Sequence, residues 1–266
     1  MVQYATIQPS YEKKYTFAAM NTAAIIPARY ASTRFPGKPL ATINGMSMIQ
    51  RVYDQACASG LDYVAVATDD SRIYDHVKAF GGEVIMTSEN CLNGTERIAE
   101  AIAHLETKPD IILNIQGDEP FILPQQINLV VKALQDPGIG IATLKKRIDS
   151  EHDLKDPNII KVVSDRDDFA LYFSRSPLPF KRDDSQNWPD FPVYFKHLGV
   201  YGFKTNILMD LVRLPETPLQ KMENLEQLCW LEHGFLIKVL ETDFQSLAID
   251  TSEDLAKAEA WAKTIQ

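Results

Sequence analysis

One short stretch of the chain gathers the residue types that bind phosphate. Three cations and two hydroxyls lie within ten residues, namely Arg29, Ser32, Thr33, Arg34 and Lys38. Arginine presents a planar fork of donors to phosphate oxygens, and lysine supplies a point charge that can stabilise a leaving group. Because the whole chain carries a net charge of −9, this basic run stands out and predicts a loop that binds a polyphosphate. The competing interpretation is a solvated basic loop.

Two acidic segments offer carboxylates for a divalent cation. Asp118 follows the apolar run Ile111–Ile115, and Asp250 follows the apolar pair Ala248–Ile249. Mg²⁺ prefers one or two carboxylates together with substrate phosphates. Two aspartates at strand ends that face a basic loop would form a metal–triphosphate site. The simpler alternatives are an acidic turn before Pro124 and a helix-capping segment that begins after Asp250.

Other reaction classes find little support. The five histidines form no H-E-x-x-H pattern, and no G-x-S-x-G elbow occurs, which argues against zinc and serine hydrolases. The basic run matches neither the Walker loop nor the dinucleotide-binding fingerprint. P-loop and Rossmann cofactor sites therefore lose their main support.

The elements expected to position these residues alternate between strand and helix. We expect strands at Ala23–Ala28, Tyr63–Ala67, Glu83–Met86, Ile111–Ile115 and Ile139–Thr143. Helices are expected at Ser47–Ser59, Arg72–Phe80, Thr95–Leu105 and Pro124–Gln135. This alternation is typical of an α/β protein with a central, mostly parallel sheet covered on both faces. Ligands bind such sheets at the carboxyl ends of the strands, where the basic run and Asp118 fall.

The second half of the chain has a different pattern. Strands are expected at Lys161–Ser164, Ala170–Arg175 and Val193–Phe203, with a Pro-rich surface loop at Pro177–Pro192. These strands predict a smaller antiparallel insertion. A helix at Met222–His233, a strand at Ile237–Leu240 and a helix at Ser252–Lys263 complete the chain. We therefore expect residues 1–21 to be an extension outside the fold and residues 22–266 to form one domain, with the insertion at about 145–205.

The composition of the chain limits its class of protein, its partners and its cellular location. With 45% hydrophobic and 24% charged residues, the chain is an ordinary globular protein. The acidic balance argues against nucleic acid and anionic membranes as partners. Three well-separated cysteines and the lack of a membrane-spanning or secretory segment predict a cytoplasmic protein without membrane insertion.

Six segments, in order along the chain, closely resemble the 3-deoxy-manno-octulosonate cytidylyltransferase family. They are Ile25–Leu40, Asn93–Arg97, Gln116–Pro120, His197–Phe203, Leu225–Leu228 and Ile249–Thr251. The resemblance implies a three-layer nucleotidyltransferase fold and a Mg²⁺-dependent, homodimeric, cytoplasmic enzyme. Its expected reaction makes CMP-Kdo from CTP and 3-deoxy-D-manno-octulosonate (Kdo) for lipopolysaccharide synthesis in Gram-negative bacteria.

The resemblance also implies roles for individual residues. Nucleotide binding is expected from Arg29, Ser32, Arg34, Lys38, Gly94, Thr95 and Gln116. Catalysis is expected from Lys38, which would act on the departing pyrophosphate, and from Arg29, Asp118 and Asp250, of which Asp118 and Asp250 would bind the metal. The sugar-acid site is expected from Arg97, Gln116, Arg175, His197, Tyr201, Glu226 and Gln227. The region of about 145–205 would contribute to sugar-acid binding and to the dimer.

Two residues depart from the family pattern as we know it, and two alternatives stay open. Asn93 stands where relatives have Ser, and Cys229 stands where many have Arg.

The sugar substrate could instead be 8-amino Kdo or a nonulosonate, which the metal and triphosphate loops do not distinguish from Kdo. The chain could also be a sugar-nucleotide binder without activity, against which the retention of Lys38, Asp118 and Asp250 argues.

Overall fold

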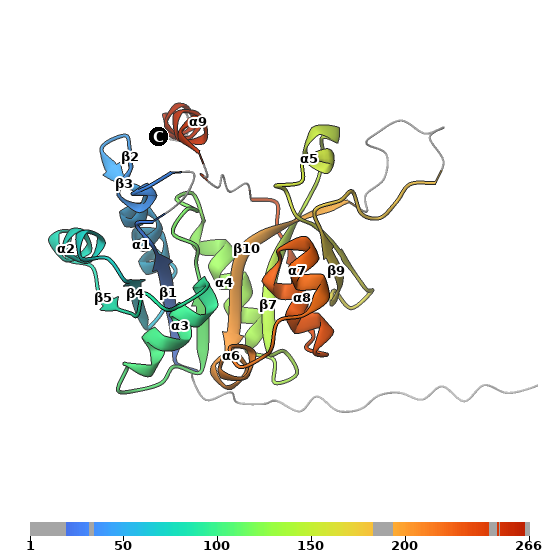
Figure 1. Ribbon diagram of the computed structural model, residues 1–266, viewed down its shortest axis with the longest axis horizontal. Helices are drawn as coiled ribbons and strands as arrows, with labels where there is room; N and C mark the ends of the chain where they lie inside the picture. Colours follow the sequence, from blue (N-terminus) through green and yellow to red (C-terminus); the bar gives the residue numbers. More distant parts are fainter. Residues whose placement is uncertain (1–19, 32–34, 183–193, 245–248, 250, 264–266) are drawn as a thin grey trace, which may run out of the picture.

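The computed structural model describes residues 20–31, 35–182, 194–244, 249 and 251–263. A single large sheet lies at the centre of the fold (Figure 1). Within these residues nine strands form one sheet, whose main path is β11-β7-β10-β6-β1-β4-β5, with β8 attached to β10 and β9 to β8. The strands are β1 Thr22–Ala28, β4 Tyr63–Thr68, β5 Val84–Met86, β6 Ile111–Asn114, β7 Ile141–Arg147, β8 Lys161–Ser164, β9 Ala170–Ser174, β10 Phe195–Lys204 and β11 Ile237–Glu241. The neighbours along the main path are parallel except at β10, which runs antiparallel to both β6 and β7. The predicted mostly parallel sheet is confirmed.

Helices cover both faces of this sheet. Along β1, Ala24 and Ile26 pack in one apolar cluster with α1 (Met48–Ala58), α2 (Ser71–Ala79) and α4 (Pro124–Leu134). Ala23 and Ile25 pack in a second cluster with α3 (Gly94–Ala103), α6 (Thr205–Leu211) and α8 (Glu226–Glu232). Successive side chains of a strand point to opposite faces, so a strand that is apolar throughout must be covered twice. The expected three layers are confirmed.

The antiparallel region grows out of the central sheet. β10 lies between β6 and β7, and its first residues also pair with β8, which in turn pairs with β9. The short helices α5 (Glu151–Lys155) and α7 (Pro218–Glu223) lie on the same side of the molecule as β8 and β9 (Figure 1). Residues 145–205 are therefore joined to the main sheet through β10.

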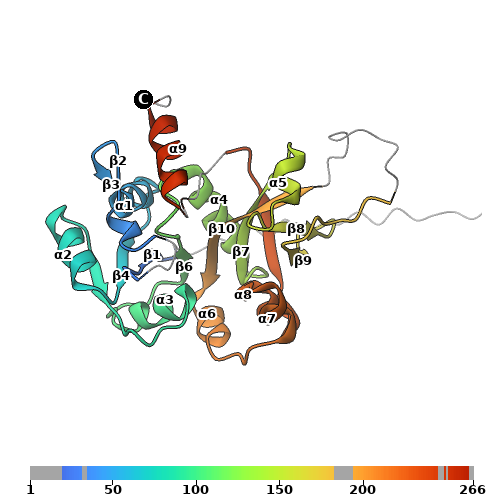
Figure 2. The same cartoon turned by 45° about the horizontal axis from the view of Figure 1, so that its top comes forward.

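A small cluster ties the C-terminal helix to the first half of the chain. Helix α9 (Ser252–Ala262) packs beside the hairpin of β2 (Thr42–Ile43) and β3 (Met46–Ser47), as Figure 2 shows. Phe121 and Trp261 meet with ring centroids 4.5 Å apart, and the fully buried Ile249 belongs to the same cluster. This packing brings the chain around Ile249 to the carboxyl end of the sheet.

Several elements differ from the sequence expectation. The single helix predicted at Met222–His233 is wrong. Helix α7 ends at Glu223, and its C-cap Asn224 adopts a left-handed conformation with φ of 51° before α8 begins. Strand β7 extends to Arg147, because β10 and β11 pair along it. Residues 183–193 of the predicted Pro-rich loop lie outside the described residues, as do residues 1–19.

The fold also includes residues just before Thr22. The backbone carbonyl of Asn21 accepts hydrogen bonds from the amides of Asp110 and Ile111.

Among the described helices, none combines the length and the apolar character needed to cross a bilayer.

Candidate active site

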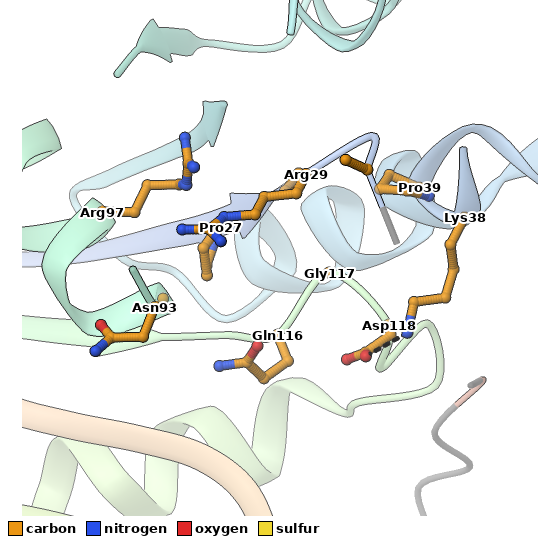
Figure 3. Close-up of a pocket in the computed structure, with 12 residues that line it drawn as sticks. Pro27, Arg29, Lys38, Pro39, Asn93, Arg97, Gln116, Gly117 and Asp118 are labelled. Atoms are coloured by element: carbon orange, nitrogen blue, oxygen red, sulfur yellow. Dashed lines mark hydrogen bonds and ion pairs between the residues drawn. The ribbon is translucent and has the colours of Figure 1, made fainter. Parts of the chain in front are cut away.

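A pocket of about 230 Å³ opens at the carboxyl ends of β1 and β6. Six of the predicted site residues line it, namely Arg29, Lys38, Gly94, Arg97, Gln116 and Asp118. Figure 3 shows Lys38 and Asp118 at one end and Arg97 at the other, with Gln116 between them. The strand ends thus bring together residues that lie up to 89 positions apart in the sequence.

The basic loop folds back at a glycine. Gly37 has a φ of 72°, which few residues other than glycine adopt readily, and its amide donates to the carbonyl of Tyr30 over 2.9 Å. Lys38 then begins a 3-10 helix, Lys38–Leu40. This turn returns Lys38 to the pocket that Arg29 lines. Ser32 and Arg34, with Thr33, lie outside the described residues.

Lys38 and Asp118 form an ion pair across the pocket. Lys38 Nζ lies 2.7 Å from Asp118 Oδ2, and the two side chains are 14% and 29% exposed. Both groups therefore keep contact with water, so that a ligand can reach them.

The segment before Asp250 approaches Asp118 from the far end of the chain. The Ile249 amide donates to the Asp118 carbonyl over 3.0 Å, and Thr251 caps α9 by accepting from the Asp254 amide. Asp250 itself lies outside the described residues. The second predicted carboxylate thus follows directly a residue whose backbone is bonded to Asp118.

Arg29 and Gly117 shape the floor of the pocket. Arg29 Nη2 is buried, and no hydrogen-bond partner for it occurs in the described part of the chain. A Cβ at Gly117 would lie 3.2 Å from the carbonyl oxygen of Pro27, so the backbone of β1 comes close only because this residue is glycine. A buried, unpaired guanidinium donor beside Lys38 favours an anionic ligand.

Helix α3 separates two groups of predicted residues. On one side, Thr95 Oγ1 donates to Glu226 Oε2 over 2.9 Å. On the other side, the fully buried Arg97 donates to Thr87 Oγ1 over 2.5 Å and forms an ion pair with Asp69. Arg97 therefore lies apart from Glu226, although both were predicted to contact the sugar acid.

The remaining sugar-acid candidates gather around β10. His197 and Tyr201 have ring centroids 5.1 Å apart, and the hydroxyl of Thr143 on β7 lies 2.9 Å from His197 Nε2. The Tyr201 hydroxyl is buried next to the hydroxyl of Thr143. These groups form a polar patch on an otherwise apolar face of the sheet.

Burial keeps this patch largely uncharged. It lowers the pKa of His197 to about 3. It also raises the pKa of Tyr201 well above its usual value, with a smaller contribution from Glu226 and against the opposing effect of a hydrogen bond with Thr143. Burial also raises the pKa of Glu226 to about 7, although the hydrogen bond from Thr95 opposes the shift. At neutral pH the imidazole and the phenol are therefore neutral, and Glu226 is near its midpoint.

Two further candidates have different surroundings. Gln227 is buried on α8. The guanidinium of Arg175 is occupied by backbone, since it donates to the carbonyls of Pro157, Glu223 and Asn224. Arg175 thus joins β9 to the end of α7, and it does not line the pocket described above.

Known proteins share both the sequence and the fold of this chain. The profile of the cytidylyltransferase family matches residues 23–241. A 3-deoxy-manno-octulosonate cytidylyltransferase from Syntrophotalea carbinolica is 51% identical over 247 residues, which cover 91% of this chain and 98% of that protein. The chain belongs to the 3-deoxy-manno-octulosonate cytidylyltransferase family. A further member from Bacteroides thetaiotaomicron is 48% identical, covering 92% and 99% of the two chains.

A solved structure agrees with this assignment. CMP:2-keto-3-deoxy-manno-octonic acid synthetase in complex with CTP is 38% identical, has a TM-score of 0.85, and is matched over 92% of this chain and 100% of its own. Family membership and the nucleotidyltransferase fold, both expected from the sequence motifs, are confirmed.

Sequence reasoning missed three residues that surround the site of this family member. Asp69 directly follows β4, as Asp118 follows closely on β6, so its place at a strand end was a usable signal. Thr87 follows β5 in the same way. Thr143 lies inside a strand, and nothing local to it indicates its contacts with β10.

Proposed function

We propose that this chain transfers a cytidylyl group from CTP to the anomeric 2-hydroxyl of Kdo, releasing pyrophosphate and forming CMP-Kdo for lipopolysaccharide synthesis. The observation that carries the proposal is the pairing of Lys38 with Asp118 at the carboxyl edge of the sheet, in the pocket that Arg29 also lines. Arg29 Nη2 is buried and has no hydrogen-bond partner among the described residues. The relatives support the proposal, because they carry the name of this activity and the chain matches nearly their whole length.

The basic loop would bind the triphosphate. Arg29, Ser32 and Arg34 would donate to its oxygens, and Lys38 would stabilise the departing pyrophosphate. The sugar hydroxyl would attack the α-phosphorus opposite the leaving group, so no covalent protein intermediate is needed. Positioning and electrostatics would supply the rate enhancement.

The acidic residues fit a divalent cation. Asp118 lines the pocket with an accessible carboxylate, and Asp250 follows directly after Ile249, which is bonded to the Asp118 backbone. Two carboxylates together with substrate phosphates are a donor set that Mg²⁺ prefers. No cluster of three or more metal-binding side chains occurs among the described residues, so phosphate oxygens would complete the coordination. Bound Mg²⁺ would reduce the charge of the phosphates and lower the pKa of the sugar hydroxyl.

The two substrates would meet near Gln116. On the nucleotide side, Gly94 and Thr95 begin α3, where backbone amides are available, because Asn93 caps only the amide of Glu96 with its side chain. On the sugar side, Gln116, His197, Tyr201, Glu226 and Gln227 would recognise Kdo. Arg97 and Arg175 would contribute its cationic contacts if substrate binding reorganises their present bonds.

A homodimer would use the antiparallel region. Leu171 on β9 is 62% exposed, Phe180 is 87% exposed and Met222 on α7 is 85% exposed. Within the described residues β9 pairs with β8, and on its other side only the preceding Phe169 forms a bridge, with Lys238 of β11. Large apolar side chains that are exposed to solvent are typical of a protein interface. We also infer a cytoplasmic location, since all three cysteines are free.

One assay tests the function. Pyrophosphate release should require CTP, Kdo and Mg²⁺ together, and should be far slower with UTP or ATP. Faster turnover with 8-amino Kdo or sialic acid would establish the alternative of another acidic sugar. Tight binding of CTP without turnover on any sugar would establish the inactive binder.

A further inference from the structure

A buried threonine lies behind the residues of β10. Thr143 of β7 is fully buried at an irregularity where Leu198 pairs with Leu144 and Tyr201 already pairs with Thr143. Two extra residues of β10, Gly199 and Val200, bulge between these pairs. Because of this bulge, His197 and Tyr201 lie side by side on one face of the sheet.

The Thr143 hydroxyl has one proton to donate and lies within hydrogen-bond distance of three groups, in addition to its interaction with the Tyr201 hydroxyl. Oγ1 lies 2.7 Å from the Val200 carbonyl oxygen, 3.2 Å from the Leu198 carbonyl oxygen and 2.9 Å from His197 Nε2. Carbonyl oxygens can only accept, so the hydroxyl proton goes to the nearer of them, Val200. The contact with His197 is then a hydrogen bond only if Nε2 carries a proton and donates it.

We propose that Thr143 is a positioning residue that fixes His197 as the Nε2–H tautomer, so that Nδ1 accepts a hydrogen bond from a hydroxyl group of the sugar substrate. This inference deepens the proposed function and rests on it for the identity of the ligand. The tautomer itself is a property of the free protein.

The surroundings of His197 agree with this role. Phe173 meets its ring edge-on, with centroids 5.2 Å apart and planes at 82°, and Tyr201 packs on another side. Among the described residues no hydrogen bond reaches Nδ1, whereas Nε2 bonds Thr143. The lowered pKa of His197 keeps the ring neutral, and a neutral ring with Nε2–H leaves Nδ1 as an acceptor.

This arrangement selects a hydroxyl over a carboxylate. A carboxylate oxygen carries no proton to donate, so Nδ1 would repel it, whereas a sugar hydroxyl would bind. The buried hydroxyl of Tyr201 offers a donor beside this acceptor. Such a pair fits the polyol part of a sugar acid and rejects an analogue that lacks the hydroxyl.

The first experiment measures the tautomer directly. Long-range ¹H–¹⁵N spectra of the full chain without substrate report the protonation of each histidine nitrogen, and His197→Gln identifies the signals of His197 among the five histidines. We expect the Nε2–H form in the wild type and in Thr143→Ser, and a mixture of tautomers in Thr143→Val. A wild-type His197 with the proton on Nδ1 would overturn the proposal, whether or not any variant folds.

The second experiment measures the consequence for substrate. Thr143→Val keeps the shape of the side chain and should raise the KM for Kdo roughly tenfold, about one lost hydrogen bond, with the KM for CTP little changed. Thr143→Ser restores the hydroxyl and should restore the KM. An unchanged KM for Kdo in a folded Thr143→Val would sink the proposal, and so would equal changes in both KM values.

The two experiments separate this proposal from the function on which it rests. If the wild type does not turn over Kdo but has the Nε2–H tautomer, the proposed function fails while the assignment of the proton stands. If Kdo is turned over and the tautomer is reversed, only the role of Thr143 fails.

Discussion

The two sides of the candidate site use different physical means. Around the basic loop, Lys38 and Asp118 form a charged pair that stays partly open to water. Around β10, the buried Thr143 and Tyr201 and the half-buried His197 form a largely neutral set. An unpaired charge is expensive to bury, whereas a neutral polar group is tolerated when it is hydrogen-bonded. The charged side should therefore respond to charge removal, and the neutral side to the loss of single hydrogen bonds.

Asp118→Asn should have the largest effect, because it removes the charge opposite Lys38 and a proposed metal ligand. We expect kcat to fall by roughly 10²–10³-fold, with the fold preserved. Steady-state pyrophosphate release and a melting curve check this. Asp110→Asn, at the other end of β6, is the matched control and should leave kcat nearly unchanged. Full activity in Asp118→Asn would remove the metal assignment.

Asp69→Asn tests whether Arg97 belongs to the charged side. Loss of the Asp69 charge would leave the fully buried guanidinium of Arg97 without its ionic partner. It should lower the free energy of unfolding by about 3 kcal/mol. Urea titration measures this, and the neighbouring Asp70→Asn, which keeps the cap of α2, is the control. If Asp69→Asn lowers the free energy of unfolding by less than Asp70→Asn does, the Asp69–Arg97 pair contributes little to stability.

Arg97→Ala assigns the guanidinium to a substrate. From the family resemblance we expect a larger rise in the KM for Kdo than in the KM for CTP. The structure sharpens this test, because Arg97 lies across α3 from Glu226. The reverse pattern would assign Arg97 to the nucleotide.

Glu226→Gln probes the neutral side through pH. The folded pKa of about 7 lies above the ordinary value, so the wild type loses stability as pH rises from about 4.5 through 7, while a glutamine does not. The melting temperature of Glu226→Gln should therefore rise relative to the wild type between pH 5.5 and 8. Parallel curves for the wild type and Glu226→Gln would mean that Glu226 is not shifted.

Removal of residues 1–19 should have the smallest effect, since the sequence assigns no site residue to them on either side. Chains that begin at Met20 should keep their kcat, both KM values and melting temperature. A large loss in any of these would show that the extension contributes to the fold or to the site.

The charged side could largely be predicted from the sequence. Asp118 follows closely on β6, and Lys38 lies in the loop that follows β1. Because parallel strands end at one edge of a sheet, local pattern was enough to expect their meeting. The break between α7 and α8 was missed, because Asn224 tolerates helical and left-handed conformations alike and its neighbours carry a helical pattern. The roles of Ser32, Arg34 and Asp250 stay predictions.

By itself the sequence determined the class of fold, the alternation of its elements and the family, because these depend on periodicity and on contiguous motifs. Only the tertiary structure decided which side of α3 Arg97 occupies, that its partner is Asp69, and that Thr143 lies behind His197. Those facts depend on the antiparallel entry of β10 between β6 and β7 and on its bulge. Register between distant segments is set by the packing of the whole sheet, and no local stretch of residues encodes it.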